Sequence, residues 1–153
     1  MNYYDRLSKL GLAIPELPRP VASYVPAKTV GNLIYASGQT GTVNQNLVYV
    51  GTVGAEVCIE RAVESARLAA LNCLAEIEHV VADLNRIEEI VRLTGYVASA
   101  PDFFRQPAVI EGASRLMLDI FGDRGTHARS AVGVATLPFN APVELEIIAL
   151  LKE

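Results

Sequence analysis

Two stretches of the chain carry apolar residues at the three- and four-residue spacing of an amphipathic helix. The longer stretch begins near Glu56 and lasts about five turns. Its apolar positions are Ile59, Ala62, Val63, Ala66, Ala69, Ala70, Cys73, Leu74 and Ile77. Because many of these positions are alanine, we expect the helix to approach a sheet closely. The second stretch, residues 107–121, predicts another helix that ends at "GDRG".

Shorter apolar runs between turn signals predict five strands, at residues 32–39, 47–51, 91–99, 130–137 and 143–151. The first two strands flank the polar segment "TGTVNQN" and the last two flank "PFNAP", so each pair is expected to form a hairpin. The segment "DLNRIEEI" is expected to be a connection into the middle strand. This order of elements indicates an α+β fold, with a mixed sheet and both helices packed on one face.

The N-terminal segment differs from the rest in its proline content. Residues 3–11 predict a short amphipathic helix that stops at Gly11, and the following "IPELPRPVASYVP" carries four prolines, which forbid helix. Residues 1–23 are therefore expected to form a helix and an extended arm. With 153 residues and no linker or repeat, residues 1–153 are expected to fold as a single domain.

Composition limits the partners and the compartment. Apolar residues make up 51% of the chain and the mean hydropathy is +0.29, so some apolar surface is expected to be covered by other subunits. With 17 acidic and 13 basic residues, the chain lacks the positive field that favours nucleic acid. Apolar runs stay shorter than the roughly 18 residues of a membrane span, and Asp5 and Arg6 interrupt any signal-peptide core. We expect a soluble cytoplasmic protein without a membrane partner.

Cysteine and histidine give weak signals. Cys58 and Cys73 lie in the helical pattern without a second ligand at zinc-site spacing, so both are expected to be buried free thiols and no metal is expected. His79 falls near the end of the long helix, where it is expected to face the helix dipole. His127 lies close enough to Arg129 to reach a ligand, although a loop histidine is more often idle. The segment "SGQTG" (37–41) lacks the lysine and glycine spacing of a nucleotide loop and predicts a bend in a strand.

The last predicted strand, "VELEIIALL", is mostly apolar on both sides. Glu144 and Glu146 point to the same side as Ile148 and Leu150, and the intervening apolar residues point to the other. One side is expected to face the helices, and the other to be covered by an equivalent sheet from a second subunit. There Glu144 and Glu146 would be partly dehydrated, which raises the pKa of a carboxyl group toward the range useful for proton transfer.

Arg129 stands at the start of the apolar run "SAVGVATLP". In the predicted hairpin Glu144 lies opposite Thr136, which leaves Arg129 seven residues away, roughly 23 Å at about 3.3 Å per residue. A site that uses both Arg129 and Glu144 must therefore lie between subunits. An arginine suits such a site because its planar guanidinium binds a carboxylate through two parallel hydrogen bonds. The plainer alternatives are a structural ion pair for Arg129 and a solvated side chain for Glu144.

Two segments, "YVPAKTVGNLIYASGQ" (24–39) and "ARSAVGVATLPFNAPVELEIIAL" (128–150), resemble the signature regions of the RidA/YjgF family, the reactive-intermediate imine deaminases, also labelled the endoribonuclease L-PSP family. The resemblance implies a chorismate-mutase-like fold, assembled as a homotrimer with sites in the clefts between subunits. It implies that Arg129 binds the substrate carboxylate and that Glu144 positions or activates water. It also implies that Gly38 offers backbone contacts beside Ser37, and that Tyr24 closes the site.

The implied reaction is hydrolysis of a small 2-imino or 2-enamino acid to a 2-keto acid and ammonia, without metal or organic cofactor. The chain departs from the family where Ala131 replaces a cysteine and His127 replaces a proline. Its second helix region is longer than usual and lacks an obvious match to a polar residue that several members carry, so it resembles a divergent branch. The alternative is a non-catalytic trimeric module that binds small carboxylic acids. Ribonuclease activity is disfavoured by the acidic pI and the absence of an aromatic-basic stripe.

Overall fold

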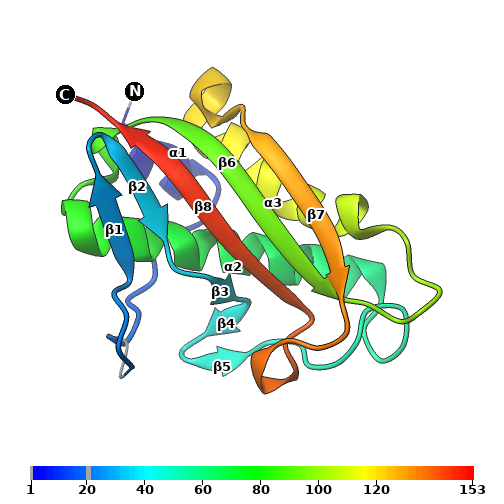
Figure 1. Cartoon of the computed structure of the whole chain (residues 1–153). Coiled ribbons are helices and arrows are strands. Elements are labelled where there is room, and N and C mark those ends of the chain that lie inside the picture. The colour runs from blue at the N-terminus through cyan, green and yellow to red at the C-terminus, as the bar shows by residue number, and fades with distance from the viewer. Residues whose placement is uncertain (1, 20–21) are drawn as a thin grey trace.

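The computed structural model describes residues 2–19 and 22–153. Its centre is a mixed sheet with the strand order β1-β2-β8-β6-β7, and β3 pairs with β8 beyond the end of β2 (Figure 1). The strands of this sheet are β1 Ala27–Val30, β2 Leu33–Ala36, β3 Gln39–Thr40, β6 Ile87–Ala98, β7 Ala128–Val134 and β8 Val143–Leu151. Strands β6 and β7 are parallel, and the other pairs are antiparallel. The mixed sheet is therefore confirmed.

The two main helices lie on one face of this sheet, as expected (Figure 1). They are α2 Ile59–Val81 and α3 Gln106–Phe121. The smaller elements are α1 Tyr3–Lys9, β4 Thr42–Val43, β5 Asn46–Leu47 and the 3-10 turns η1 Leu84–Arg86, η2 Gly122–Gly125 and η3 Pro138–Asn140. None of the helices in the described ranges combines the length and the apolar character that crossing a membrane requires.

The apolar stripe of α2 packs as its alanines predict. Ala62, Ala66, Ala69 and Ala70 are fully buried, so at these positions no long side chain separates α2 from its neighbours. At Gly112 of α3, an added Cβ would overlap the carbonyl oxygen of Val63 in α2. Because Gly112 has no side chain, the backbone of α3 lies close to the backbone of α2 at Val63.

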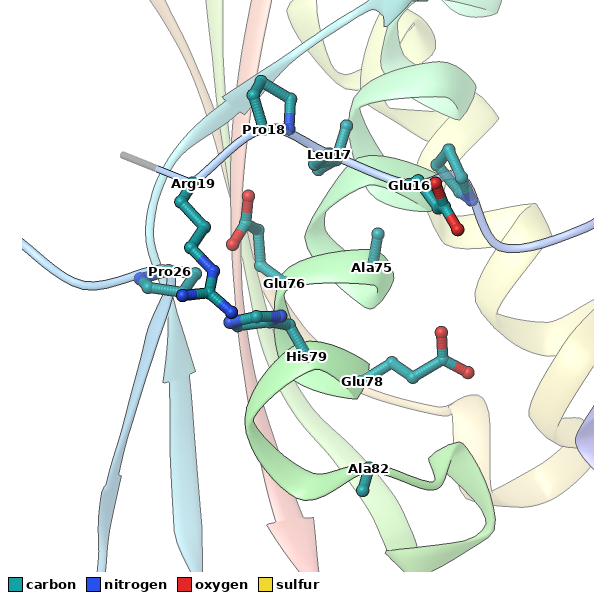
Figure 2. Close-up of a pocket in the computed structure, with 11 residues that line it drawn as sticks. Glu16, Leu17, Pro18, Arg19, Pro26, Ala75, Glu76, Glu78, His79 and Ala82 are labelled. Atoms are coloured by element: carbon teal, nitrogen blue, oxygen red, sulfur yellow. The ribbon is translucent and has the colours of Figure 1, made fainter. Parts of the chain in front are cut away.

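The N-terminal helix is fixed to α2 by tyrosine hydrogen bonds. The Asn2 side chain caps α1 by accepting from the Tyr4 amide, and the Tyr4 hydroxyl donates to Glu78 Oε1 at 2.6 Å. Burial and this bond raise the pKa of Tyr4 to about 12. Residues 14–19 then run extended along α2 (Figure 2). Residues 1, 20 and 21 of the expected helix and arm lie outside the described residues.

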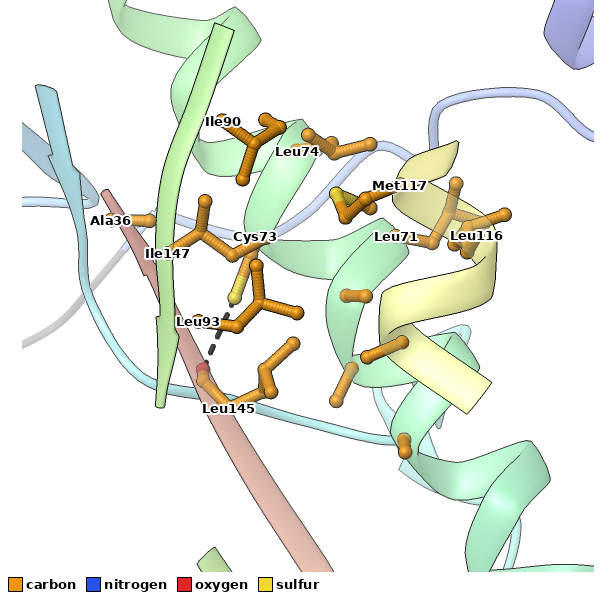
Figure 3. Close-up of a cluster of buried hydrophobic side chains, with 14 of the residues drawn as sticks. Ala36, Leu71, Cys73, Leu74, Ile90, Leu93, Leu116, Met117, Leu145 and Ile147 are labelled. Carbon is orange, nitrogen blue, oxygen red and sulfur yellow. Dashed lines mark hydrogen bonds between the residues drawn. The ribbon is translucent and has the colours of Figure 1, made fainter. Parts of the chain in front are cut away.

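The core lies between the sheet and the two helices (Figure 3). Cys73 of α2 is fully buried there, and its Sγ donates to the carbonyl oxygen of Leu145 at 3.1 Å. Burial raises the pKa of the Cys73 thiol, which keeps it protonated. Cys58 is exposed at the N-cap of α2, so the expectation of a buried thiol is right for Cys73 and wrong for Cys58.

The predicted hairpin of strands 130–137 and 143–151 is wrong, because β6 lies between β7 and β8. After α3 the chain returns to the sheet as β7, which takes one edge of β6 in parallel. The chain then crosses through η3 to the other edge of β6. Phe139 and Asn140 make this crossing with φ of 58° each, in the left-handed region.

The predicted N-terminal hairpin also has different partners. Strand β2 turns at Gly31 to pair with β1, and β8 takes its other edge. Residues 42–47 close only the two-residue ladder of β4 and β5, and residues 48–51 form no strand. The expected connection before residue 91 is largely strand, since β6 begins at Ile87. The two errors in hairpin pairing share one cause, because strand partners depend on contacts between residues that are remote in the sequence.

Candidate functional site

Arg129 lies on the edge strand β7 and points toward the helices. It is in register with Leu93, a fully buried residue of the helix-facing side of β6. Its Nη1 donates to Glu111 Oε2 and to Ser114 Oγ of α3, both at 3.1 Å. The Arg129 side chain is 25% exposed and that of Glu111 is 52% exposed, so the pair sits at the surface with the arginine as its more buried member.

Ser114 and His127 continue the network that holds Arg129. His127 Nδ1 lies 2.6 Å from the carbonyl oxygen of Gly125, which can only accept, so Nδ1 carries the proton. In the neutral ring, His127 Nε2 is then an acceptor, and Ser114 Oγ lies 2.9 Å from it. Arg129 therefore donates to Ser114, Ser114 donates to His127, and His127 donates to the Gly125 carbonyl oxygen. This chain of hydrogen bonds holds Nη1 of the Arg129 guanidinium in place.

Ser114 and His127 also have the spacing of a nucleophile and its base, but their surroundings favour a positioning role. Ser114 is only 7% exposed, within the buried face of α3. Its oxygen already accepts a hydrogen bond from Arg129, which withdraws electron density from it. A serine that a substrate cannot approach is not available for nucleophilic attack.

Glu144 is the second residue of β8 and faces the other side of the sheet. It is in register with Tyr96, whose hydroxyl donates to Glu146 Oε1 at 3.1 Å on that same open side. The Glu144 side chain makes no hydrogen bond or ion pair within residues 2–19 and 22–153. Burial, followed by the nearby charge of Glu146, raises the pKa of the Glu144 carboxyl.

Gly38 lies directly against this carboxyl group. A Cβ at Gly38 would stand 3.2 Å from Glu144 Cδ, so the missing side chain leaves the room that the carboxyl fills. Ser37 precedes it, and its Oγ donates to the Val25 carbonyl oxygen at 2.6 Å. This bond ties the segment that carries Tyr24 to the end of β2. Tyr24 is 58% exposed and lines, with Gln39 and other residues, a cavity of about 420 Å³.

Four of the five residues singled out from the sequence thus gather near β3 and the start of β8, and Arg129 does not. Strands β8 and β6 separate β3 from β7. The 23 Å separation assumed a hairpin that does not exist. Arg129 and Glu144 are instead three residues apart along β6, about 10 Å, and on opposite faces of the sheet. Within one chain they cannot contact the same small molecule, so a shared site stays a prediction that needs a second chain.

Sequence reasoning missed Glu111 and Ser114. Both lie on one side of α3 because they are three residues apart, and that side faces β7. The sequence signal was one polar residue, Ser114, in the otherwise apolar stripe of this helix, with Glu111 one turn before it. His79 does not belong to this region, since it lines a separate cavity beside α2. Among the residues described, no group of three or more His, Cys, Asp and Glu side chains is placed to hold a metal ion.

Comparison with known proteins agrees with this architecture. A sequence profile of the family described as "YjgF/chorismate mutase-like, putative endoribonuclease" matches residues 4–151. Protein TCP17 of Trypanosoma cruzi is 36% identical over 147 residues, which cover 95% of this chain and 92% of that protein. A 2-iminobutanoate/2-iminopropanoate deaminase of Dermatophagoides farinae is 31% identical over 142 residues, 92% of this chain and 95% of that protein.

The fold agrees as well. The crystal structure of an Agrobacterium tumefaciens protein of unknown function matches with a TM-score of 0.90 and 40% identity, over 97% of this chain and 91% of that one. The profile spans nearly the whole chain, and both the sequence relatives and the solved structure match from end to end. This chain therefore belongs to the YjgF/chorismate mutase-like family.

Proposed function

We propose that this protein hydrolyses small 2-imino or 2-enamino acids to 2-keto acids and ammonia, in clefts between the subunits of a homotrimer. Arg129 of one chain binds the substrate carboxylate, and Glu144 of the next chain moves the protons. The observation that carries the proposal is the state of Arg129, whose guanidinium is held in place and already binds one carboxylate, that of Glu111. The deaminase of Dermatophagoides farinae, 31% identical, supports the choice of reaction.

The arrangement of the sheet supports a ring of subunits. Arg129 lies at one edge strand, and Gly38 and Glu144 lie near the opposite edge at β3. A head-to-tail contact joins opposite edges of neighbouring chains, and it gives a closed ring when the rotation closes. The open face of the sheet carries exposed apolar side chains that such a contact would cover, namely Val30, Tyr35 and Val132.

The chemistry needs little beyond orientation and one acid-base group. Water adds to the carbon of the C=N bond while Glu144 takes a proton from it. The same carboxyl returns this proton to the nitrogen, which gives a carbinolamine. It then passes the hydroxyl proton to the amino group, the C–N bond breaks, and ammonia leaves the keto acid. A raised pKa suits this exchange, because a carboxyl that titrates nearer to the working pH is a better proton donor. An enamine is first protonated at carbon to give the imine.

The remaining residues orient the reactants. Arg129 binds the carboxylate end of the substrate and so holds the C=N carbon in a fixed orientation relative to the water, which accelerates the reaction. Gly38 lets the backbone beside Ser37 lie close to the Glu144 carboxyl, where the water must stand. Tyr24 is exposed at the rim and closes the cleft over the substrate. No metal or organic cofactor takes part in the proposed reaction.

The decisive experiment uses two variants that are inactive separately. 2-Aminoacrylate is generated in place by a serine dehydratase, and release of the keto acid is followed with wild type, Arg129→Ala and Glu144→Gln. Each substitution is expected to lower kcat/KM on the order of a hundredfold, since each removes a whole function. The matched control, Glu146→Gln, changes a carboxyl on the same strand face that is hydrogen-bonded to Tyr96. It should stay within a few-fold of wild type.

The two inactive variants are then unfolded, mixed in equal amounts and refolded together. In random mixed rings about a quarter of the clefts combine an intact Arg129 with an intact Glu144, so activity should return to about that fraction. Failure to recover activity would show that the cleft is not shared between chains. No acceleration by wild type, together with saturable binding of a keto acid, would establish the non-catalytic module instead.

A further inference from the structure

A cavity of about 430 Å³ lies between the N-terminal arm and the C-terminal half of α2, away from Arg129 and Glu144. The arm forms one wall with residues 15–19, and α2 forms the other. The side chains of Arg19, Glu76 and His79 point into the space between them (Figure 2). Glu16 and Glu78 complete its charged lining.

Glu76 is the unusual member of this lining. It is only 6% exposed, yet its carboxyl makes no hydrogen bond or ion pair with any described residue. Burial raises the pKa of Glu76, and the neighbouring His79 opposes that rise. Its carboxyl oxygens still open onto the cavity, because Ser65 Oγ is the only side-chain oxygen or nitrogen of the described residues that is both fully buried and unpartnered. A partly dehydrated carboxylate without a protein partner is therefore available to a positively charged ligand.

The charges around Glu76 favour a positive group. Glu16 and Glu78 add negative charge, although Glu78 already accepts the Tyr4 hydroxyl. The C-terminal end of α2, which carries the negative end of the helix dipole, closes the cavity at Ala82. A primary ammonium group matches these surroundings, because it is compact and donates three hydrogen bonds.

Arg19 gives the other end of the cavity the opposite preference. No carboxylate of the described part of the chain forms an ion pair with Arg19, so its guanidinium is available to an anion. A carboxylate is the group that a guanidinium binds best. We propose that this cavity binds a free α-amino acid, with its ammonium group on Glu76 and its carboxylate on Arg19.

The size and location agree with such a ligand. Cavities that hold small molecules begin at about 300 Å³, so this one admits an amino acid with a small or medium side chain. Both anchors belong to the same chain, so the site is complete without assembly. The cavity beside Tyr24 and Gln39 adjoins this site, because Arg19 and Glu76 line both cavities, but Arg129 and Glu144 line neither of them.

The test is equilibrium dialysis of the assembled protein with radiolabelled glycine, L-serine and L-leucine. At least one of them is expected to bind saturably, and Glu76→Gln and Arg19→Ala should each weaken binding by about tenfold or more. Glu60→Gln, on the exposed first turn of the same helix, and Arg129→Ala should leave it unchanged. Glutamine has nearly the same shape as glutamate but no charge, so Glu76→Gln should not impair folding. Arg19→Ala should not impair folding either, because Arg19 is exposed.

Three outcomes would overturn the proposal. The first is absence of binding by all three amino acids. The second is binding that Arg129→Ala abolishes while Arg19→Ala and Glu76→Gln preserve it, since the ligand would then occupy the deaminase cleft. The third is equally tight binding of ethanolamine with no effect of Arg19→Ala, which would indicate a site for simple amines. Failure of deaminase activity alone would leave this proposal intact.

Discussion

The surroundings of Arg129 and Glu144 contrast sharply. Arg129 lies on an edge strand and is held by Glu111 and Ser114, whereas Glu144 lies on an inner strand without a hydrogen-bond partner among the described residues. The arginine is fixed before any ligand arrives. The glutamate has unused hydrogen-bonding capacity, and burial raises its pKa. This difference is consistent with the two proposed roles. A fixed Arg129 suits recognition of a carboxylate, and a Glu144 with a raised pKa suits proton transfer.

Arg129→Lys is expected to have the largest effect on activity. Lysine keeps the charge but loses the planar fork, so it cannot hold Glu111 and Ser114 while it binds a second carboxylate. We expect kcat/KM for an imino acid to fall on the order of a hundredfold. Arg115→Lys is the matched control, because Arg115 pairs with the same Glu111 from an exposed position. Equal losses in both variants would show that Arg129 has no special role.

Ser114→Ala tests whether the network behind Arg129 positions it. The substitution leaves His127 Nε2 without its donor and Arg129 without one acceptor, which should destabilise the fold by about 1–3 kcal/mol. KM should rise about tenfold with little change in kcat, since the carboxylate is bound equally before and during reaction. Steady-state kinetics and thermal unfolding measure the two effects.

Two variants control this prediction. Ser114→Thr restores the hydroxyl and should recover most of the lost affinity. Ser65→Ala removes a buried hydroxyl that has no hydrogen-bond partner among the residues that the structure describes, so it should leave KM unchanged and stability unchanged or higher. A change in kcat alone for Ser114→Ala would contradict a positioning role.

Gly38→Ala tests whether Glu144 needs the free space beside its carboxyl group. The backbone at Gly38 lies outside the left-handed region, so alanine is not strained, but its Cβ would press on the Glu144 carboxyl from 3.2 Å. We expect a several-fold loss of kcat and little loss of stability. Combined with Glu144→Ala, the same substitution should have no further effect. Additive losses would show that Gly38 acts on something other than Glu144.

The smallest effect is the pH dependence that Glu144 adds to stability. Because its pKa is raised in the fold, the folded state holds its proton more tightly than the unfolded state. The free energy of unfolding therefore falls as the pH rises from the ordinary value of 4.5 through the raised pKa. Glu144→Gln should lack this loss and exceed wild type at pH 7 but not at pH 3. Urea unfolding across this range measures it, and parallel curves would refute the assignment.

The sequence determined the elements whose signals are local. The apolar stripe near Glu56 and residues 107–121 gave both main helices, and the alternation of 143–151 gave β8 with its bounds. The same alternation placed Glu144 and Glu146 on the side opposite the core, because successive side chains of a strand point to opposite faces. Tyr24, Ser37 and Gly38 were chosen for a different reason, namely the resemblance of residues 24–39 to a signature region of a known family.

Only the tertiary structure decided which strands pair. Both predicted hairpins joined neighbours in sequence, but β6 separates β7 from β8, and that insertion depends on how α3 returns the chain to the sheet. The same return brings Glu111 and Ser114 to Arg129, and the packing of residues 15–19 beside α2 places Arg19 and Glu76 around one cavity. Periodicity reports hydrogen bonds between near neighbours along the chain, whereas these contacts join residues that only packing brings together.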